Sequence, residues 1–166
     1  MLSDTHLGRL METLDRLVPV DKLDEFSFEA NPATFTEKKV RFWRSLGMTR
    51  VSLGVQSLDS GILHLLGREH TPAQALHSVE MLKNAGMAHI NMDLMFAIPG
   101  QTLSIWEATL KEAVRAGTDH ISAYNLTYEE DTEFFRSLLR GEKRQDPDED
   151  AAYFELAEHM LEAAGM

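Results

Sequence analysis

Apolar and polar residues along the chain follow two periods, one typical of amphipathic helices and one typical of strands. Helices are predicted over residues 3–18, 36–46, 72–85 and 102–116. Strands are predicted over residues 25–30, 50–56, 89–96 and 120–126. A glycine follows the second, third and fourth helices, as a left-handed C-cap requires. Strands that alternate with helices in this way predict parallel βαβ units and an α/β fold.

The pattern predicts about four parallel strands with flanking helices, and the first helix has no strand before it. A closed eight-stranded barrel is therefore excluded within this chain. Beyond the last strand, the sequence predicts a short helix over about 134–139, an acidic linker "GEKRQDPDED", and a helix from about 150 to 164. We predict an α/β domain over residues 1–142, and a linker with the start of a C-terminal helical region over residues 143–166.

Composition and charge narrow the class of protein. The 166 residues are 43% apolar, which suits one compact core, and 16 basic against 27 acidic side chains give a net charge of −11. That charge disfavours nucleic acid as a partner. The chain has no apolar run of the roughly 18 to 20 residues that a transmembrane helix needs, and no signal-peptide pattern, so a cytoplasmic location is expected. Cysteine is absent, and no histidines have metal-ligand spacing, so no metal site is predicted.

A carboxylate stands where a buried strand would normally carry an aliphatic side chain. Asp93 lies within the apolar run "NMDLMF", and burying it without a partner would cost several kcal/mol. Glu29 and Gln56 close two other predicted strands. Ligands of parallel α/β folds bind at the carboxyl ends of the strands, so we expect these three side chains to meet in one crevice.

Further polar residues are expected at the same rim. Asn125 and Thr127 close the fourth strand, and Arg68 follows the short helical run "SGILHLL". Carboxylates, an amide and a guanidinium together suit a zwitterionic, ribose-bearing ligand. The structural alternatives are that Glu29 caps the helix after Asn31 and that the other polar residues serve turns. A nucleophile with a base, an HExxH motif and a P-loop are all absent, so binding is predicted rather than catalysis.

Four segments in order carry a family resemblance: "FSFEANPATFTEKKV", "RVSLGVQSLDSGILHLLGREHT", "INMDLMFAIPGQT" and "HISAYNLTYEEDTEFF". From about residue 5 to its end the chain resembles the radical S-adenosylmethionine (SAM) proteins of the oxygen-independent coproporphyrinogen III oxidase family. The resemblance implies that residues 1–142 form part of a (β/α)6-type barrel. The residues that correspond to the cofactor contacts of this family are Glu29, Gln56, Arg68, Asp93 and Thr127.

Two motifs of that family are absent from this chain. One is the CxxxCxxC loop, whose thiolates hold a [4Fe–4S] cluster, and the other is a GGGTP-type loop. The resemblance therefore implies a fragment whose intact parent uses SAM and a [4Fe–4S] cluster, while the fragment itself cannot hold the cluster and is expected to be inactive. Whether the parent is an enzyme is left open. An unpaired strand edge is expected, which would favour self-association.

The resemblance implies that the parent cleaves SAM reductively and decarboxylates coproporphyrinogen III oxidatively to protoporphyrinogen IX, in haem biosynthesis. The alternative within the family is a haem chaperone that binds and transfers haem, and "GVQS" and "LGREHT" look more like that branch. Two alternatives lie outside it. An aldolase or isomerase barrel would use Glu29 and Asp93 as acid and base, but it would need a lysine or a phosphate loop at a strand end. A non-catalytic α/β binding module is the other.

Overall fold

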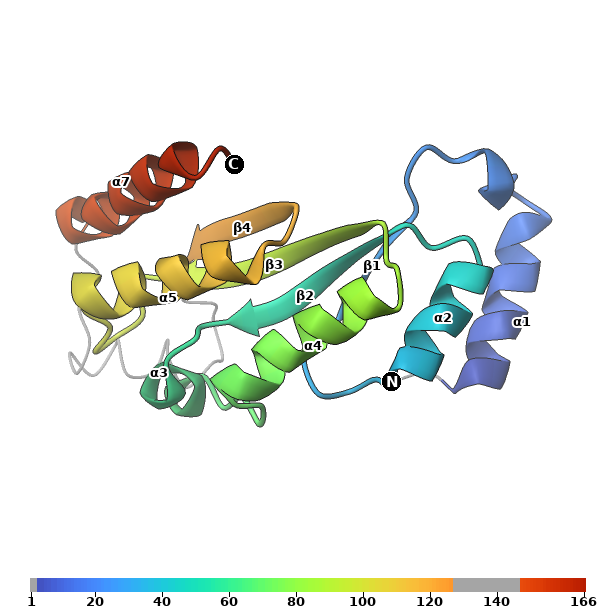
Figure 1. Ribbon diagram of the computed structural model, residues 1–166, viewed down its shortest axis with the longest axis horizontal. Coiled ribbons are helices and arrows are strands. Elements are labelled where there is room, and N and C mark those ends of the chain that lie inside the picture. Colours follow the sequence, from blue (N-terminus) through green and yellow to red (C-terminus); the bar gives the residue numbers. More distant parts are fainter. Residues whose placement is uncertain (1–2, 127–146) are drawn as a thin grey trace.

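Four parallel strands form one sheet at the centre of the protein. The computed structural model describes residues 3–126 and 147–166. The strands are β1 (Ser27–Ala30), β2 (Arg50–Gln56), β3 (His89–Phe96) and β4 (His120–Asn125). They lie in the order in which they occur in the sequence, with every neighbouring pair parallel (Figure 1). This confirms the predicted α/β class with four parallel strands.

Helices precede, connect and follow the strands, and most of the longer ones cover one face of the sheet (Figure 1). They are α1 (Asp4–Asp15), α2 (Glu37–Ser45), α3 (Ser60–Leu65), α4 (Pro72–Asn84), α5 (Leu103–Ala116) and α7 (Pro147–Ala163), with a 3₁₀ turn η1 (Val20–Lys22) after α1. The side chains that cap the N-termini of the first five helices are Ser3, Thr36, Asp59, Thr71 and Thr102. The glycines after α2, α4 and α5 all have positive φ, which confirms the predicted C-caps.

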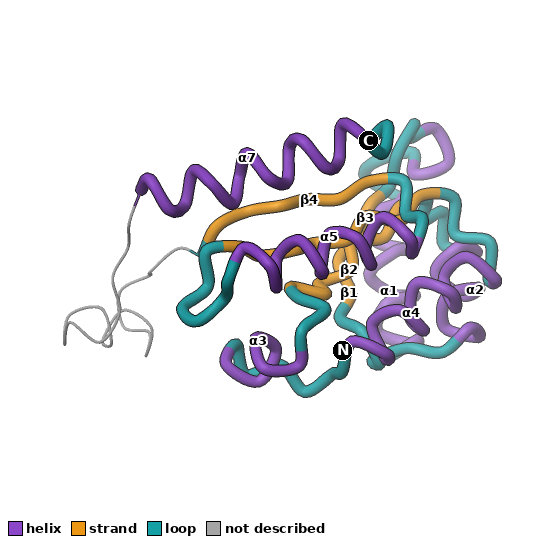
Figure 2. Tube along the Cα trace, turned by 60° about the vertical axis from the view of Figure 1, so that its left-hand side comes forward, coloured by secondary structure: helices purple, strands orange, loops and turns teal. Residues whose placement is uncertain are grey.

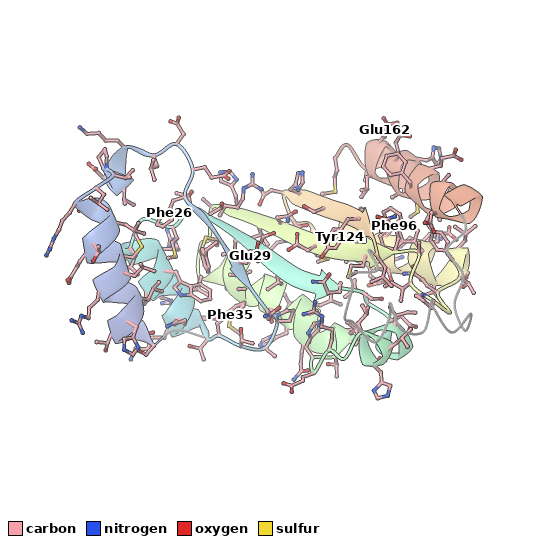
Figure 3. The ribbon with its side chains drawn as sticks, turned by 180° about the vertical axis from the view of Figure 1, so that it is seen from behind. Phe26, Glu29, Phe35, Phe96, Tyr124 and Glu162 are labelled. Atoms are coloured by element: carbon pink, nitrogen blue, oxygen red, sulfur yellow. The ribbon has the colours of Figure 1, made fainter. Side chains whose placement is uncertain are left out.

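The two faces of the sheet differ in chemistry. Alternate strand residues such as Val51, Leu53 and Met92 are fully buried under the helices. Figure 1 shows α4 and α5 in front of the strands, and the reverse view in Figure 3 shows the other face without a helix over it. A sheet in sequential order with helices on one face is a section of a (β/α) barrel wall, in which the uncovered face is the inner one.

Two tryptophans organise the core beneath the helices. Trp43 of α2 packs edge-on against Phe28 of β1, with ring centroids 4.6 Å apart. Trp106 of α5 is completely buried, and its indole N–H donates to the carbonyl of Tyr153 at 3.0 Å. Tyr153 belongs to α7, which runs alongside α5 and β4 (Figure 2) and shares the main hydrophobic core.

The structure changes the predicted ends of several elements. The first helix ends at Asp15 rather than at residue 18, and Leu17 is 77% exposed. Pro19 lacks a backbone N–H and restricts Val18, so the chain cannot continue as a helix beyond residue 18. The first strand begins at Ser27, and the C-terminal helix begins at Pro147, within the predicted linker. The predicted helix at about 134–139 and the boundary at residue 143 lie outside the described residues.

Candidate functional site

A polar cleft of 640 Å³ opens on the uncovered face, toward the carboxyl ends of the strands. Its lining consists of Glu29, Ala30, Asn31, Ser52, Gly54, Gln56, Arg68, Asp93 and Tyr124. Figure 3 shows Glu29 on β1 and Tyr124 on β4 on this same face. The structure thus brings together Glu29, Gln56, Arg68 and Asp93, as the sequence predicted. Thr127 lies outside the described residues.

The carboxylate of Asp93 is held by hydrogen bonds from two neighbouring side chains. The Ser52 hydroxyl contacts both carboxylate oxygens, at 3.0 and 2.9 Å, and the Asn91 amide donates to Oδ1 at 2.7 Å. Asp93 is paired with Gly54 of β2, which has no side chain to cover it. These hydrogen bonds therefore offset the free-energy cost of placing an acid in the strand. The position of Asp93 in the cleft wall is what points to a ligand.

A ladder of polar side chains extends from Asp93 across three strands. The amide nitrogen of Asn91 on β3 lies 2.6 Å from the Ser52 hydroxyl of β2 and 3.0 Å from the Ser122 hydroxyl of β4. Its carbonyl oxygen lies 2.7 Å from Nδ1 of His120. These contacts tie the strands together on the uncovered face and fix the direction of the Asp93 carboxylate. The sequence interpretation missed Ser52 and Asn91, although both stand an even number of positions from a predicted site residue.

Gln56 enters the cleft through an irregularity in its strand. The register between β2 and β3 shifts between Gly54 and Gln56, and Gln56 has φ of 70° in the left-handed region. Its side chain is buried, and its carbonyl oxygen accepts a 2.7 Å hydrogen bond from the Tyr124 hydroxyl. Strain of this kind in a residue other than glycine is common at binding sites.

Tyr124 forms one wall of the cleft, and the sequence interpretation missed it. Burial raises the pKa of Tyr124 above its usual value of 10.0, and the nearby charge of Asp93 raises it further. The phenol therefore remains protonated at neutral pH and donates to Gln56. The sequence interpretation selected the next residue, Asn125. Strand alternation instead places Tyr124 on the same face as Ser122, two residues before it.

The charges around the cleft suit a ligand that carries both signs. Glu29 and Asp93 can accept hydrogen bonds from an ammonium group or from ribose hydroxyls, and Arg68 can pair with a carboxylate. Within the described ranges, neither Glu29 nor Arg68 takes part in a salt bridge. SAM has an ammonium group, a carboxylate and a ribose, so it fits this donor and acceptor set.

The described residues, 3–126 and 147–166, offer no set of metal ligands. The sequence has no cysteine, and the residues that the structure describes contain no group of three His, Cys, Asp or Glu side chains able to hold a metal ion. A [4Fe–4S] cluster therefore has no ligand set here. The helices that are described are also too short or too polar for any of them to cross a membrane.

His70, close to Arg68 at the rim, gives the fold a predicted pH dependence. Burial lowers its pKa below the ordinary 6.5, although the hydrogen bond from Nε2 to the Val55 carbonyl acts in the opposite direction. Between the lowered pKa and 6.5 the unfolded chain binds more protons than the folded chain, so the free energy of unfolding falls as the pH drops through 6.5. We expect His70→Gln to flatten this dependence in urea titrations. A variant that loses stability in parallel with the wild type down to about pH 5 contradicts the assignment.

Known proteins resemble this chain in sequence. The sequence model of the radical SAM superfamily matches residues 2–113. The heme chaperone HemW of Bacillus subtilis (strain 168) is 33% identical over 167 residues, which cover 99% of the chain and 44% of the relative. HemW of Mycobacterium tuberculosis (strain H37Rv) is 38% identical over 143 residues, with coverages of 85% and 36%. The chain spans less than half the length of these relatives.

Solved structures resemble it in fold. Coproporphyrinogen III oxidase (HemN) from Escherichia coli, a radical SAM enzyme, matches with a TM-score of 0.83 over 99% of this chain and 38% of its own, at 22% identity. Elp3 of Methanocaldococcus infernus matches with a TM-score of 0.65 over 72% of this chain and 29% of its own, at 29% identity. The likeness to HemN shows the fold and confirms the four strands as part of a radical SAM barrel. Because the superfamily model matches residues 2–113, more than half of the chain, the chain belongs to the radical SAM superfamily.

Proposed function

We propose that the cleft binds SAM, with Glu29, Gln56, Arg68 and Asp93 as its contacts. The observation that carries the proposal is that four residues chosen for cofactor chemistry line one polar cleft of 640 Å³. Thr127 remains a proposed fifth contact. The work of these residues is to bind and orient the cofactor, since the chemistry belongs to the cofactor itself. In this family, bound SAM supplies a 5′-deoxyadenosyl radical on reductive cleavage.

For the complete protein we propose a haem chaperone that binds haem and passes it to acceptor proteins. The support is the name heme chaperone HemW, which relatives from Bacillus, Mycobacterium and Escherichia carry at 31 to 38% identity. An oxidase that converts coproporphyrinogen III to protoporphyrinogen IX is the second candidate, supported by the fold of HemN. No residue of this chain is assigned to the cluster that either activity would use.

The two candidates are separated by assaying the complete protein after reconstitution with iron and sulfide. A haem chaperone is expected to bind haem with a defined absorbance spectrum, to transfer it to an apo-haemoprotein, and to leave coproporphyrinogen III unconsumed. Consumption of coproporphyrinogen III with SAM turnover would instead establish the oxidase. If the complete protein neither transferred haem nor consumed coproporphyrinogen III, both candidates would be contradicted.

Replacing Gly54 by alanine is expected to block the cleft. A Cβ at this position would lie 3.0 Å from Oδ1 of Asn31 and 3.1 Å from Nε2 of Gln56, so the amide that borders the cleft would have to move. We expect the affinity for SAM, followed by equilibrium dialysis, to fall by about tenfold or more, the equivalent of roughly 1.4 kcal/mol.

The matched control is Gly8→Ala in α1, where a Cβ would meet no atom within 4 Å. This change should stabilise the helix by about 0.5 to 1 kcal/mol and leave SAM binding unchanged. Equal affinities for the Gly54 variant and the wild type would show that the space over Gly54 is not used by the ligand.

A further inference from the structure

The amide of Gln56 is held at one end and open at the other. The residue is 6% exposed, and the carbonyl oxygen of its side chain accepts the hydrogen bond from Tyr124. Its nitrogen borders the cleft above Gly54 and has no hydrogen-bond partner within residues 3–126 and 147–166. Within the part of the chain that the structure describes, no fully buried side-chain nitrogen or oxygen lacks a partner, so this amide nitrogen is accessible from the cleft and can donate to an acceptor there.

Three features of the chain act together to produce this arrangement. The left-handed backbone at Gln56 brings its side chain into the cleft at the shifted register, and the absence of a side chain at Gly54 leaves room for the amide nitrogen. The phenol of Tyr124 comes from β4, two strands away in the sheet, and supplies the third feature. In the structure the phenol donates to the amide oxygen, and in this rotamer the amide nitrogen faces the cleft.

We propose that Tyr124 is a positioning residue that fixes the Gln56 amide with its nitrogen toward the cleft, so that this point recognises a hydrogen-bond acceptor of the ligand. The inference deepens the proposed function, on which it rests for the identity of the ligand as SAM. It assigns Tyr124 no contact with reacting atoms. Without the Tyr124 hydroxyl, the Gln56 amide is expected to rotate and to spend part of its time with its oxygen toward the acceptor of the ligand. In that orientation the two oxygens would repel each other.

The first test needs no ligand. In a ¹⁵N-labelled chain the side-chain amide signals of Gln56, assigned by their loss in Gln56→Leu, are expected to shift in Tyr124→Phe, which removes only the hydroxyl. Unchanged Gln56 amide signals in Tyr124→Phe would overturn the proposal, whatever the chain binds.

The second test is a double-mutant cycle on SAM affinity. Tyr124→Phe is expected to weaken binding about three- to tenfold, the usual range for one neutral hydrogen bond. In the Gln56→Leu background the same change should have no effect, because the amide that it positions is gone. Equal losses in both backgrounds, or no loss in the wild-type background, would overturn the positioning role.

Tyr153→Phe is the matched control, because it also removes a hydroxyl. That hydroxyl donates to the Gln101 carbonyl at 2.5 Å. Tyr153 lies on α7 and does not line the cleft. It should lower stability without changing SAM affinity. If the wild-type chain bound no SAM at all, the proposed function would fail, and ligand recognition by Gln56 would fail with it. The amide signals would still decide whether Tyr124 fixes Gln56.

Discussion

Replacing Asp93 by alanine is expected to reduce the affinity for SAM by roughly ten- to a hundredfold, the range for a hydrogen bond to a charged group. Ser52 and Asn91 already orient the carboxylate, so it loses little conformational entropy when it binds a ligand. Binding is measured by equilibrium dialysis at neutral pH. The variant also leaves Ser52 and Asn91 without their acceptor, so a stability loss of about 1 to 3 kcal/mol accompanies the loss of binding.

Asp119→Ala provides the matched control for Asp93. The Asp119 carboxylate accepts a hydrogen bond from the Ile90 backbone N–H at 2.8 Å and does not line the cleft. Its loss should lower stability while SAM affinity stays at the wild-type level. A folded Asp93 variant that binds as tightly as the wild type would remove Asp93 from the site.

Replacing Trp106 by alanine is expected to be the most destabilising single change, at about 3 to 5 kcal/mol. The side chain is fully buried between the sheet and α7, packs against Phe96 at 5.7 Å, and donates to the Tyr153 carbonyl. Alanine would leave a cavity and remove the hydrogen bond that joins α5 to the Tyr153 carbonyl of α7. Urea denaturation followed by circular dichroism measures the loss.

Trp106→Phe separates the two contributions. It retains most of the apolar volume but removes the indole N–H, so we expect a smaller loss than with alanine. Because the hydrogen bond reaches α7, the two variants also test whether that helix packs on α5 in solution. A loss below about 1 kcal/mol for the alanine variant would contradict the packing of α5 against α7.

The periodicity of the sequence was sufficient to predict the strands and the helices that join them. Thr36, Thr71 and Thr102 cap their helices, and a glycine ends three of them, so local signals and the final fold agree there. Local signals were insufficient at the end of the first helix, which stops at Asp15 although its apolar stripe continues to Val18.

Within the strands, the residues of the candidate site were predicted only where a residue was unusual for its own strand. Asp93 and Gln56 interrupt apolar runs, and both line the cleft. Tyr124, Ser52 and Asn91 are ordinary strand residues, and their roles arise from pairing between strands. Ser52 faces Asn91 across β2 and β3 because of a register that no local pattern specifies. The structure was therefore needed to identify side chains whose role depends on a partner in another strand.

The most direct test of the central claim is a titration of the ¹⁵N-labelled chain with SAM to millimolar concentration, followed by the backbone amide signals. We predict saturable shifts at the carboxyl ends of the strands, at Glu29, Gly54, Gln56 and Asp93, and none in the groove between α1 and α2 around Met11 and Phe42. Shifts confined to that groove, or none at any concentration, would contradict the assignment of the cleft to SAM.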